Sequence, residues 1–256
     1  MQNNTFKDLI TEEKIIRFER LSSTNDYAKT LVLSKVKPIE EGTVIMADDQ
    51  YAGKGQHGST WSAKPGENLT FSIVLCPIFL NPNHQFRLNI AISLAIRNYL
   101  SNFLSERVEI KWPNDIYIKG RKIAGILIEN ILYGSKWSYS IIGIGININQ
   151  ASFDKTLPNA TSLSNETSRS YDINVELPLL LKEIEASYLG LKTGGHTKQK
   201  AAYIKSLYRL GELHPFEING VRVEGKIAGV NEEGKLLMDF NGHIADFDLK
   251  EIAYVT

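Results

Sequence analysis

Two spacings of hydrophobic residues alternate along the chain and predict a mixed architecture of strands and helices. Short apolar runs, each typical of a buried strand, occur at residues 15–19, 42–47, 68–76, 108–112 and 139–148. Apolar residues recur at helical spacing over residues 86–104, which predicts a long amphipathic helix. Another helix is expected over residues 27–34, because the polar cluster Ser22-Ser-Thr-Asn-Asp26 before it is a typical N-cap.

The rest of the first 211 residues predicts a hairpin and two closing helices. Residues 116–118 and 122–130 flank Lys119-Gly-Arg121, where glycine suits a tight turn. A loop that opens a short helix at residues 161–164 then leads to predicted helices at 177–191 and 197–210.

The composition changes from about His214 onward. Short strand patterns are separated there by the turn pairs Asn219-Gly220, Glu233-Gly234 and Asn241-Gly242. We therefore predict two domains, a larger one over residues 1–211 and a small β module over residues 212–256.

Charge and composition exclude several classes of protein. Lysine plus arginine and aspartate plus glutamate both count 29, and a formal net charge of zero argues against non-specific nucleic-acid binding. The single Cys76 lies in an apolar run and is expected to be a small buried hydrophobe rather than a nucleophile. No apolar run approaches the ~20 residues of a membrane span, and residues 1–8 do not form a signal peptide. These features predict a cytoplasmic protein.

The first candidate for chemistry is the loop Tyr51-Ala-Gly-Lys-Gly-Gln-His-Gly-Ser-Thr-Trp61. Its glycines let backbone N–H groups approach a ligand closely, its lysine attracts phosphate or carboxylate, and its indole could cover a flat group. The loop has neither the P-loop nor the dinucleotide-binding glycine pattern. A flexible surface turn is the alternative interpretation.

The second candidate is Lys111-Trp-Pro-Asn-Asp115, with Lys122 across the predicted hairpin. The two lysines could neutralise a carboxylate or a phosphate, and Asp115 could hold Mg²⁺ together with nucleotide phosphates. The alternative is an ion pair between Lys111 and Asp115 at the end of a strand, with Lys122 on a solvated face.

Two further segments carry polar or glycine residues at unusual places. Gly143-Ile-Gly-Ile-Asn147 places glycines inside an apolar strand, which marks close approach by a ligand or tight packing. Ser22-Ser-Thr-Asn25 together with Gln50 offers both donors and acceptors to a planar polar ligand, although helix capping also explains the first four.

Taken in order, these segments resemble the biotin protein ligase family. The resemblance covers about the first 150 residues and rests above all on Lys-Trp-Pro-Asn-Asp115 paired with Arg121-Lys-Ile-Ala-Gly125. It implies an α+β fold with a mixed sheet like that of class II aminoacyl-tRNA synthetases, followed by a small SH3-like β-barrel. It also implies a two-step reaction with ATP and Mg²⁺. Biotin is first activated as biotinyl-5′-AMP and is then transferred to a lysine of a biotin carboxyl carrier protein.

The resemblance assigns roles to residues of this sequence. It implies that Lys122, Lys111 and Asp115 are catalytic, with Asp115 on the metal. The implied biotin-binding residues are Ser23, Thr24, Asn25, Gln50, Gly53, Lys54, Gly55, Gln56, Lys122 and Gly125. The implied nucleotide-binding residues are Lys54, Gln56, Trp61, Lys111, Asn114 and Asn147.

The sequence departs from the family pattern in two ways. The family loop is often Gly-Arg-Gly-Arg, whereas Gly53-Lys-Gly-Gln56 lacks both arginine forks, which predicts weaker retention of the adenylate. Only about 14 residues precede the first predicted strand, too few for a helix-turn-helix domain, so we expect a ligase that does not bind DNA. A monomer and a homodimer both stay open.

Two other functions stay open as alternatives. A lipoate or octanoate ligase or transferase shares this fold, but its aliphatic substrate would favour an apolar slot over Ser23, Thr24 and Gln50. A non-catalytic biotin or nucleotide sensor is disfavoured by the presence of both Lys111 and Lys122.

Overall fold

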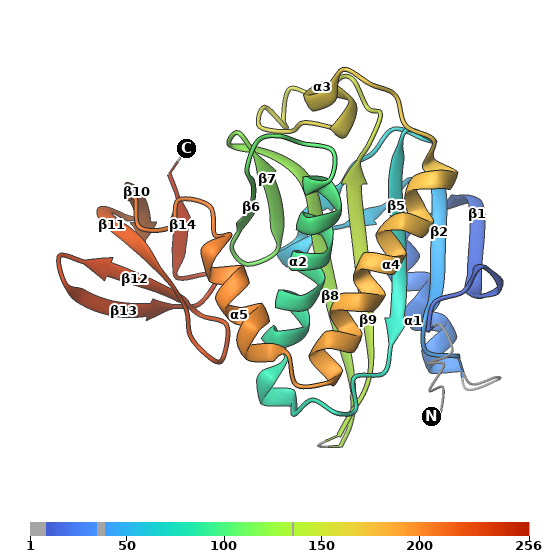
Figure 1. Cartoon of the computed structure of the whole chain (residues 1–256), viewed down its shortest axis with the longest axis horizontal. Helices are drawn as coiled ribbons and strands as arrows, with labels where there is room; N and C mark the ends of the chain where they lie inside the picture. The colour runs from blue at the N-terminus through green and yellow to red at the C-terminus, as the bar shows by residue number, and fades with distance from the viewer. Residues whose placement is uncertain (1–8, 35–38, 135, 256) are drawn as a thin grey trace, which may run out of the picture.

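A seven-stranded mixed sheet forms the centre of the molecule (Figure 1). The computed structural model describes residues 9–34, 39–134 and 136–255. Residues 1–8, to which the prediction about a signal peptide refers, lie outside the described part. The strands run in the order β1-β2-β5-β9-β8-β7-β6, with β1 and β2 parallel and every other neighbouring pair antiparallel. Their bounds are β1 (Ile15–Leu21), β2 (Thr43–Gln50), β5 (Asn68–Leu75), β6 (Val108–Lys111), β7 (Asp115–Ile118), β8 (Arg121–Tyr133) and β9 (Lys136–Asn147).

Helices cover both faces of this sheet, which explains why its central strands are apolar at nearly every position. Helices α2 (Phe86–Ser101) and α4 (Ile173–Lys192) lie in front of the sheet in Figure 1, and α1 (Thr24–Ser34) lies behind it. Alternate residues of β2 therefore enter different cores, because successive side chains of a strand point to opposite faces. Val44 and Met46 join the cluster with α2 and α4, whereas Ile45 packs with α1.

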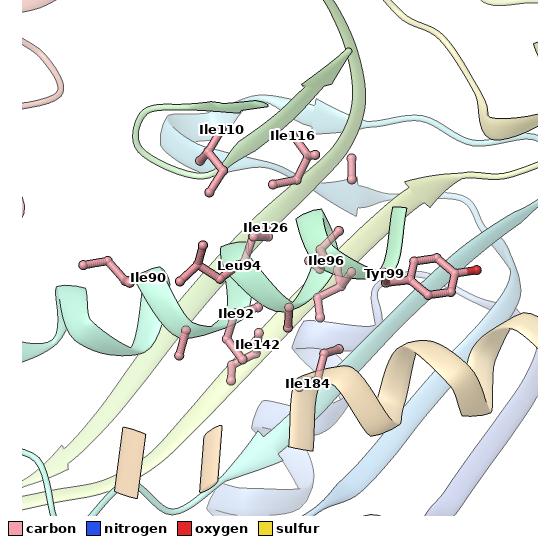
Figure 2. Close-up of a cluster of buried hydrophobic side chains, with 14 of the residues drawn as sticks. Ile90, Ile92, Leu94, Ile96, Tyr99, Ile110, Ile116, Ile126, Ile142 and Ile184 are labelled. Carbon is pink, nitrogen blue, oxygen red and sulfur yellow. The ribbon is translucent and has the colours of Figure 1, made fainter. Parts of the chain in front are cut away.

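The larger core lies between the sheet and α2 and α4. Figure 2 shows Ile92 and Ile96 of α2 beside Ile142 of β9 and Ile184 of α4. All four side chains are buried. The predicted helix at 86–104 is confirmed, although it ends at Ser101.

Helix α1 begins at Thr24 rather than 27, and two larger differences in helix boundaries have a local cause. Helix α4 begins at Ile173 rather than 177, because the Asp172 side chain accepts a hydrogen bond from the N–H of Asn174 and caps the helix. Helix α5 (His196–Lys205) ends before 210, because the chain leaves it to pair with β6. The N–H of Ile110 donates to the Ser206 carbonyl, and the N–H of Tyr208 donates to the Ile110 carbonyl.

The glycine loop contains short regular elements rather than a featureless turn. Strand β3 (Gly53–Lys54) pairs with β4 (Thr60–Trp61), and a single 3₁₀ turn, η2 (Gln56–Gly58), connects them. Two more 3₁₀ turns, η1 (Glu12–Lys14) and η3 (Pro82–His84), and a short helix, α3 (Leu163–Thr167), complete this part of the chain. Helix α3 begins at Leu163, within residues 161–164, where the sequence predicts that a short helix opens.

The C-terminal segment forms a separate five-stranded antiparallel sheet in the order β13-β12-β11-β10-β14. Asn219-Gly220 and Asn241-Gly242 have positive φ at both positions, as the predicted tight turns require. Within the described residues the edge strands β13 and β14 do not pair, so the sheet is open and the expected closed barrel is not observed. Its strands are β10 (Leu213–Ile218), β11 (Val221–Val230), β12 (Leu236–Phe240), β13 (His243–Phe247) and β14 (Ile252–Tyr254).

The C-terminal sheet shares its core with the rest of the molecule. Phe216, Ile227 and Met238 are fully buried and belong to the same hydrophobic cluster as α2 and α4. Within the described ranges, no helix combines the length and the apolar character needed to cross a bilayer.

Candidate active site

A cavity of about 360 Å³ lies where the central sheet, the glycine loop and the C-terminal sheet meet. Gly143 and Gly145 of β9 contribute to its wall from the face that α1 covers, because they alternate with Ile142 and Ile144 of the opposite core. The cavity brings together these residues named by the sequence: Ser23, Thr24, Asn25, Gln50, Lys54, Gly55, Gln56, Trp61, Lys111, Asn114, Asp115, Lys122 and Gly125.

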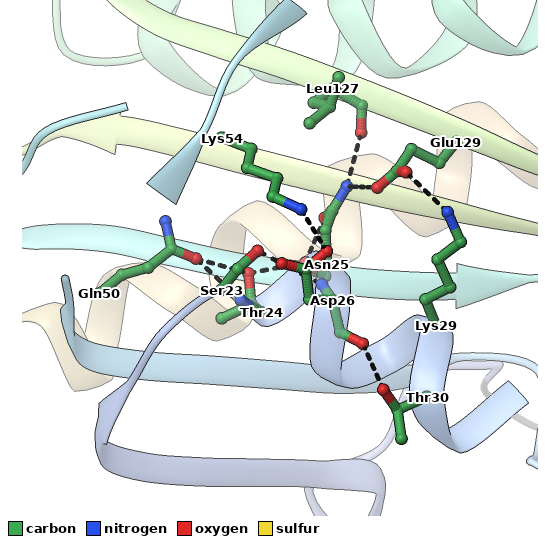
Figure 3. A network of polar contacts seen from close by, with 11 residues as sticks. Ser23, Thr24, Asn25, Asp26, Lys29, Thr30, Gln50, Lys54, Leu127 and Glu129 are labelled. Carbon is green, nitrogen blue, oxygen red and sulfur yellow. Dashed lines mark hydrogen bonds and ion pairs between the residues drawn. The ribbon is translucent and has the colours of Figure 1, made fainter. Parts of the chain in front are cut away.

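A polar network forms one end of the cavity (Figure 3). The Gln50 side-chain oxygen accepts hydrogen bonds from the Thr24 N–H at 2.8 Å and from the Thr24 hydroxyl at 3.1 Å. The Ser72 hydroxyl lies 2.7 Å from Thr24 Oγ1 and 2.6 Å from Asn25 Oδ1, and Asn25 Nδ2 donates to Glu129 at 2.9 Å. These contacts fix the orientation of buried donors and acceptors before any ligand arrives.

Helix capping accounts for part of the same cluster. The Ser23 hydroxyl accepts a hydrogen bond from the Asp26 N–H at 3.3 Å, the interaction expected of an N-cap. The capping interpretation is thus confirmed, and the same segment places Ser23, Thr24 and Asn25 in the cavity lining.

Three glycines keep this face of the sheet open to large neighbours. A Cβ atom at Gly143 would lie 2.4 Å from Asn25 Oδ1, and one at Gly145 would lie 2.2 Å from the Trp61 indole. Gly125 is the register partner of Gly145, and its Cβ would lie 3.2 Å from both Trp61 and the Lys122 side chain. The glycines in the strands therefore permit close approach of side chains that line the cavity.

Three lysines and one carboxylate set the charge of the described cavity lining. Lys122 Nζ lies 2.6 Å from Asp115 Oδ1 and 5.7 Å from the centroid of the Trp61 ring. The alternative pairing of Lys111 with Asp115 is therefore wrong, because the lysine within ion-pair distance of that carboxylate is Lys122. The Lys111 ammonium instead lies 3.3 Å from the Tyr117 hydroxyl.

Lys111 and Lys54, the other two lysines of the cavity, have pKa values shifted in opposite directions by their surroundings. Burial lowers the pKa of Lys111, the neighbouring cations Lys122 and Arg209 lower it further, and Asp115 opposes them. Lys54 extends from the glycine loop to Asp26 at the start of α1, with 2.7 Å between Nζ and Oδ1. This hydrogen bond raises the pKa of Lys54.

Gly53 and Asn147 do not line the cavity. A Cβ at Gly53 would lie 2.5 Å from Gln50 Nε2, so this glycine lets the loop pass over the polar end. Asn147 is buried, and its Nδ2 donates to the Thr161 carbonyl at 2.9 Å. The Asn114 amide does line the cavity, but its Nδ2 donates to the Ile126 carbonyl and so braces the hairpin.

Sequence reasoning missed several residues of this site. Ser72 anchors the polar network from behind, and its one signal is a polar residue within the apolar strand Asn68–Leu75. No local signal marks the contribution of the C-terminal sheet, because only the folded chain brings it to the cavity. That contribution consists of Ile252, Ala253 and Tyr254 of β14, together with Leu249 of the turn before it.

The donor set suits a magnesium ion that arrives with phosphate rather than a resident metal centre. The described residues contain no group of three or more histidine, cysteine, aspartate or glutamate side chains that could hold a metal. Asp115 is the single carboxylate of the described lining. Mg²⁺ commonly takes one or two carboxylates and completes its shell with waters and substrate phosphates.

The fold is similar to that of solved biotin protein ligases. A structure of the Aquifex aeolicus biotin protein ligase in complex with biotin and ATP superposes with a TM-score of 0.77 at 27% identity, over 93% of this chain and 97% of that chain. The bifunctional ligase/repressor BirA of Bacillus subtilis is 32% identical over 240 residues, which are 92% of this chain and 72% of the relative. The biotin–acetyl-CoA-carboxylase ligase of Paracoccus denitrificans is 30% identical over 226 residues, covering 86% of this chain and 91% of the relative.

Residues 17–147 match the Biotin/lipoate A/B protein ligase family. This range contains the glycine loop, both lysine segments and the glycines of β9. The chain belongs to this family.

Proposed function

We propose that the protein is an ATP-dependent ligase that activates biotin as biotinyl-5′-AMP and transfers it to a lysine of a biotin carboxyl carrier protein. One observation carries the proposal: a single cavity holds a fixed polar network at one end and the ammonium groups of Lys111 and Lys122 at the other. Biotin has a polar ureido ring and a carboxylate, so both ends of that cavity match one ligand.

In the first step the biotin carboxylate attacks the α-phosphorus of ATP, the bond to the bridging oxygen breaks, and pyrophosphate leaves. Two anions must approach each other, and preorganised cations lower that barrier. Lys122 would contact the carboxylate and the forming anhydride, with Lys111 beside it. Bound Mg²⁺, held by Asp115, would supply neutralisation of phosphate charge.

In the second step the carrier lysine, as a neutral amine, attacks the acyl carbon and forms an amide. The bond from that carbon to the phosphate oxygen breaks, AMP leaves, and the new amide nitrogen loses a proton to solvent. Ser23, Thr24, Asn25 and Gln50 would hold the ureido ring throughout. Lys54, Gly55, Gln56 and Gly125 would lie along biotin and its acyl link, and Trp61 and Asn114 would serve the nucleotide side. Gly53 and Asn147, which lie outside the cavity lining, would support these two groups from behind.

The polar end of the cavity argues against lipoate or octanoate as the acid. An aliphatic chain would form no hydrogen bond with the polar side chains of Thr24, Asn25 and Gln50, and would favour an apolar slot instead. A non-catalytic sensor has no need of two lysines beside a carboxylate. Homologues named as biotin ligases favour the same choice.

Biotin-dependent exchange of pyrophosphate into ATP tests the proposal. The wild-type protein should exchange with biotin and not with lipoate, and Lys122→Ala should lower the exchange rate by about 100-fold or more, since electrostatic groups of this kind are worth several kcal/mol. Lys119→Ala is the matched control, because Lys119 lies on the same hairpin but pairs with Glu106 outside the cavity. Binding of biotin without exchange would identify a sensor, and exchange with lipoate alone would identify the sibling enzyme.

Other features of the proposal await their own tests. The identity of the carrier domain, a monomeric or dimeric state, a cytoplasmic location and the absence of DNA binding stay predictions. Sequence-specific binding of an operator by the purified chain would contradict the last of these. The division into a catalytic domain over residues 1–211 and a β module over 212–256 is likewise proposed.

A further inference from the structure

The last strand of the C-terminal sheet reaches the cavity beside Lys111. Tyr254 of β14 lines the cavity, and its ring centroid lies 4.7 Å from Lys111 Nζ. The Tyr117 ring lies on the same ammonium, with 5.0 Å between Nζ and its centroid. Two tyrosines, one from each sheet, therefore hold this cation: Tyr254 by its ring, and Tyr117 by its ring edge and by its hydroxyl, which accepts from Lys111 Nζ at 3.3 Å.

Lys111 differs from the two other lysines of the cavity in what holds it. Lys122 is paired with Asp115 and Lys54 with Asp26, each at hydrogen-bond distance. Among the described residues Lys111 forms no ion pair with a carboxylate. Aromatic rings attract a cation without cancelling its charge, so this ammonium stays available to an anionic ligand.

The ring of Tyr254 is fixed by its own neighbours. Its centroid lies 5.4 Å from that of Phe216 in β10 and 6.3 Å from that of Tyr208. The Tyr208 centroid in turn lies 5.4 Å from that of Tyr117, so these aromatic rings form a continuous series of tilted contacts beside the Lys111 ammonium. These contacts restrict where the Lys111 ammonium can go, since two aromatic neighbours, Tyr208 and Phe216, limit the movement of the rings that hold it.

A second contact docks the C-terminal sheet next to the same lysine. Trp112 Nε1 donates a hydrogen bond to the Gly234 carbonyl at 2.8 Å. A Cβ atom at Gly234 would lie 2.2 Å from the Phe86 ring, so the turn between β11 and β12 is inserted tightly against α2. The C-terminal sheet is thus held on both Lys111 and its neighbour in sequence.

We propose that Tyr254 is a positioning residue, which holds the Lys111 ammonium toward the cavity so that the C-terminal sheet completes the binding site for the nucleotide phosphates. This inference rests on the proposed function. It gives the C-terminal sheet a specific part in the first chemical step: one ring face that keeps an unneutralised cation in place.

The test compares Tyr254→Leu with Tyr254→Phe in the full-length protein. Leucine removes the ring face, and the kcat/KM of pyrophosphate exchange for ATP should fall about tenfold, as expected for one partly desolvated cation–π contact. Phenylalanine keeps the ring and should stay within about twofold of the wild type. The Kd for biotin alone should be unchanged in both variants, because the ring of Tyr254 contacts Lys111, Tyr208 and Phe216, none of which belongs to the polar network.

Two further variants separate positioning from general damage to the sheet. Phe240→Leu removes an aromatic ring that packs on Phe247 in the same sheet and does not line the cavity, so its kcat/KM for ATP should match the wild type. In a Lys111→Met background, Tyr254→Leu should cause little further loss, because the two residues act through one contact.

The inference is overturned if Tyr254→Leu leaves kcat/KM for ATP unchanged, or if its effect is as large in the Lys111→Met background as in the wild type. An equal loss in Phe240→Leu would also overturn it, since the effect would then be structural. These outcomes all require a wild-type protein that exchanges with biotin. A wild-type protein without biotin-dependent exchange would instead refute the proposed function.

Discussion

Gly143→Ala should disrupt the polar end of the cavity, although it adds a single methyl group. The new Cβ would lie 2.4 Å from Asn25 Oδ1, a distance that requires one of the two to move. Asn25 cannot move freely, because its oxygen contacts Ser72 at 2.6 Å and its nitrogen donates to Glu129 at 2.9 Å. The methyl group therefore forces either strain in the strand or loss of these hydrogen bonds.

The size of the effect follows from those two costs. Overpacking a tight site costs about 1–3 kcal/mol, and a buried amide that loses a partner costs about 1–3 kcal/mol. We expect the free energy of unfolding to fall by about 2–4 kcal/mol. The two costs do not add fully, because a shift of Asn25 that relieves the strain breaks its hydrogen bonds, whereas keeping those bonds keeps the strain. Since Asn25 is proposed to contact biotin, the affinity of the Gly143→Ala protein for biotin should fall roughly 10–100-fold.

Urea unfolding and calorimetric titration with biotin measure the two quantities. Gly145→Ala is the matched control two residues along the same strand, where the added Cβ meets the Trp61 indole instead. Trp61 belongs to the glycine loop, and its Nε1 has no hydrogen-bond partner among the described residues, so this variant adds overpacking of about 1–3 kcal/mol but breaks no hydrogen bond of the Asn25 network. A Gly143→Ala protein with wild-type stability and biotin affinity would refute the view that the Asn25 network is rigid.

Three other perturbations give independent checks. Gln56→Arg adds a cation at the cavity lining, so the adenylate should dissociate more slowly in a stopped-flow chase; an unchanged or faster rate would argue against it. Burial raises the pKa of the Cys76 thiol to about 11, so iodoacetamide at pH 8 should modify the native protein at least about 100-fold more slowly than the urea-unfolded chain. Equal rates in the two states would contradict this assignment. Glu166→Gln should lower the free energy of unfolding by about 1–3 kcal/mol, because the buried carboxylate accepts from Thr161 and pairs with Arg121 at 2.7 Å; urea curves that coincide with the wild type would count against that pairing.

The elements that could be predicted from sequence are those whose burial is uniform. Strands β5 and β9 are apolar almost throughout because they are covered on both faces, and α2 has a full buried stripe. Element ends were harder to predict where a partner distant in sequence decides them. The end of α5 depends on Ile110, because its backbone forms hydrogen bonds with Ser206 and Tyr208, whose backbone groups would otherwise continue the helix.

The same distinction holds within the site. Gln50, Lys122 and the glycine loop lie in local motifs, and in the structure Gln50, Lys122 and residues of that loop line one cavity. Tyr254 carries no such signal, because a tyrosine in a β module is ordinary until the fold brings it to Lys111. The choice of Lys122 rather than Lys111 as the partner of Asp115 likewise depends on side-chain geometry that spacing alone does not fix.

The continuity of the hydrophobic core across both sheets has a thermodynamic consequence. Phe216 and Met238 of the C-terminal sheet pack in one cluster with α2 and α4. Unfolding of either the C-terminal sheet or the central sheet with its helices would therefore expose apolar surface on the other. Heating should therefore melt the described chain in one cooperative transition. Any small molecule seated between the two sheets would raise that melting temperature for the whole protein, according to its concentration and affinity.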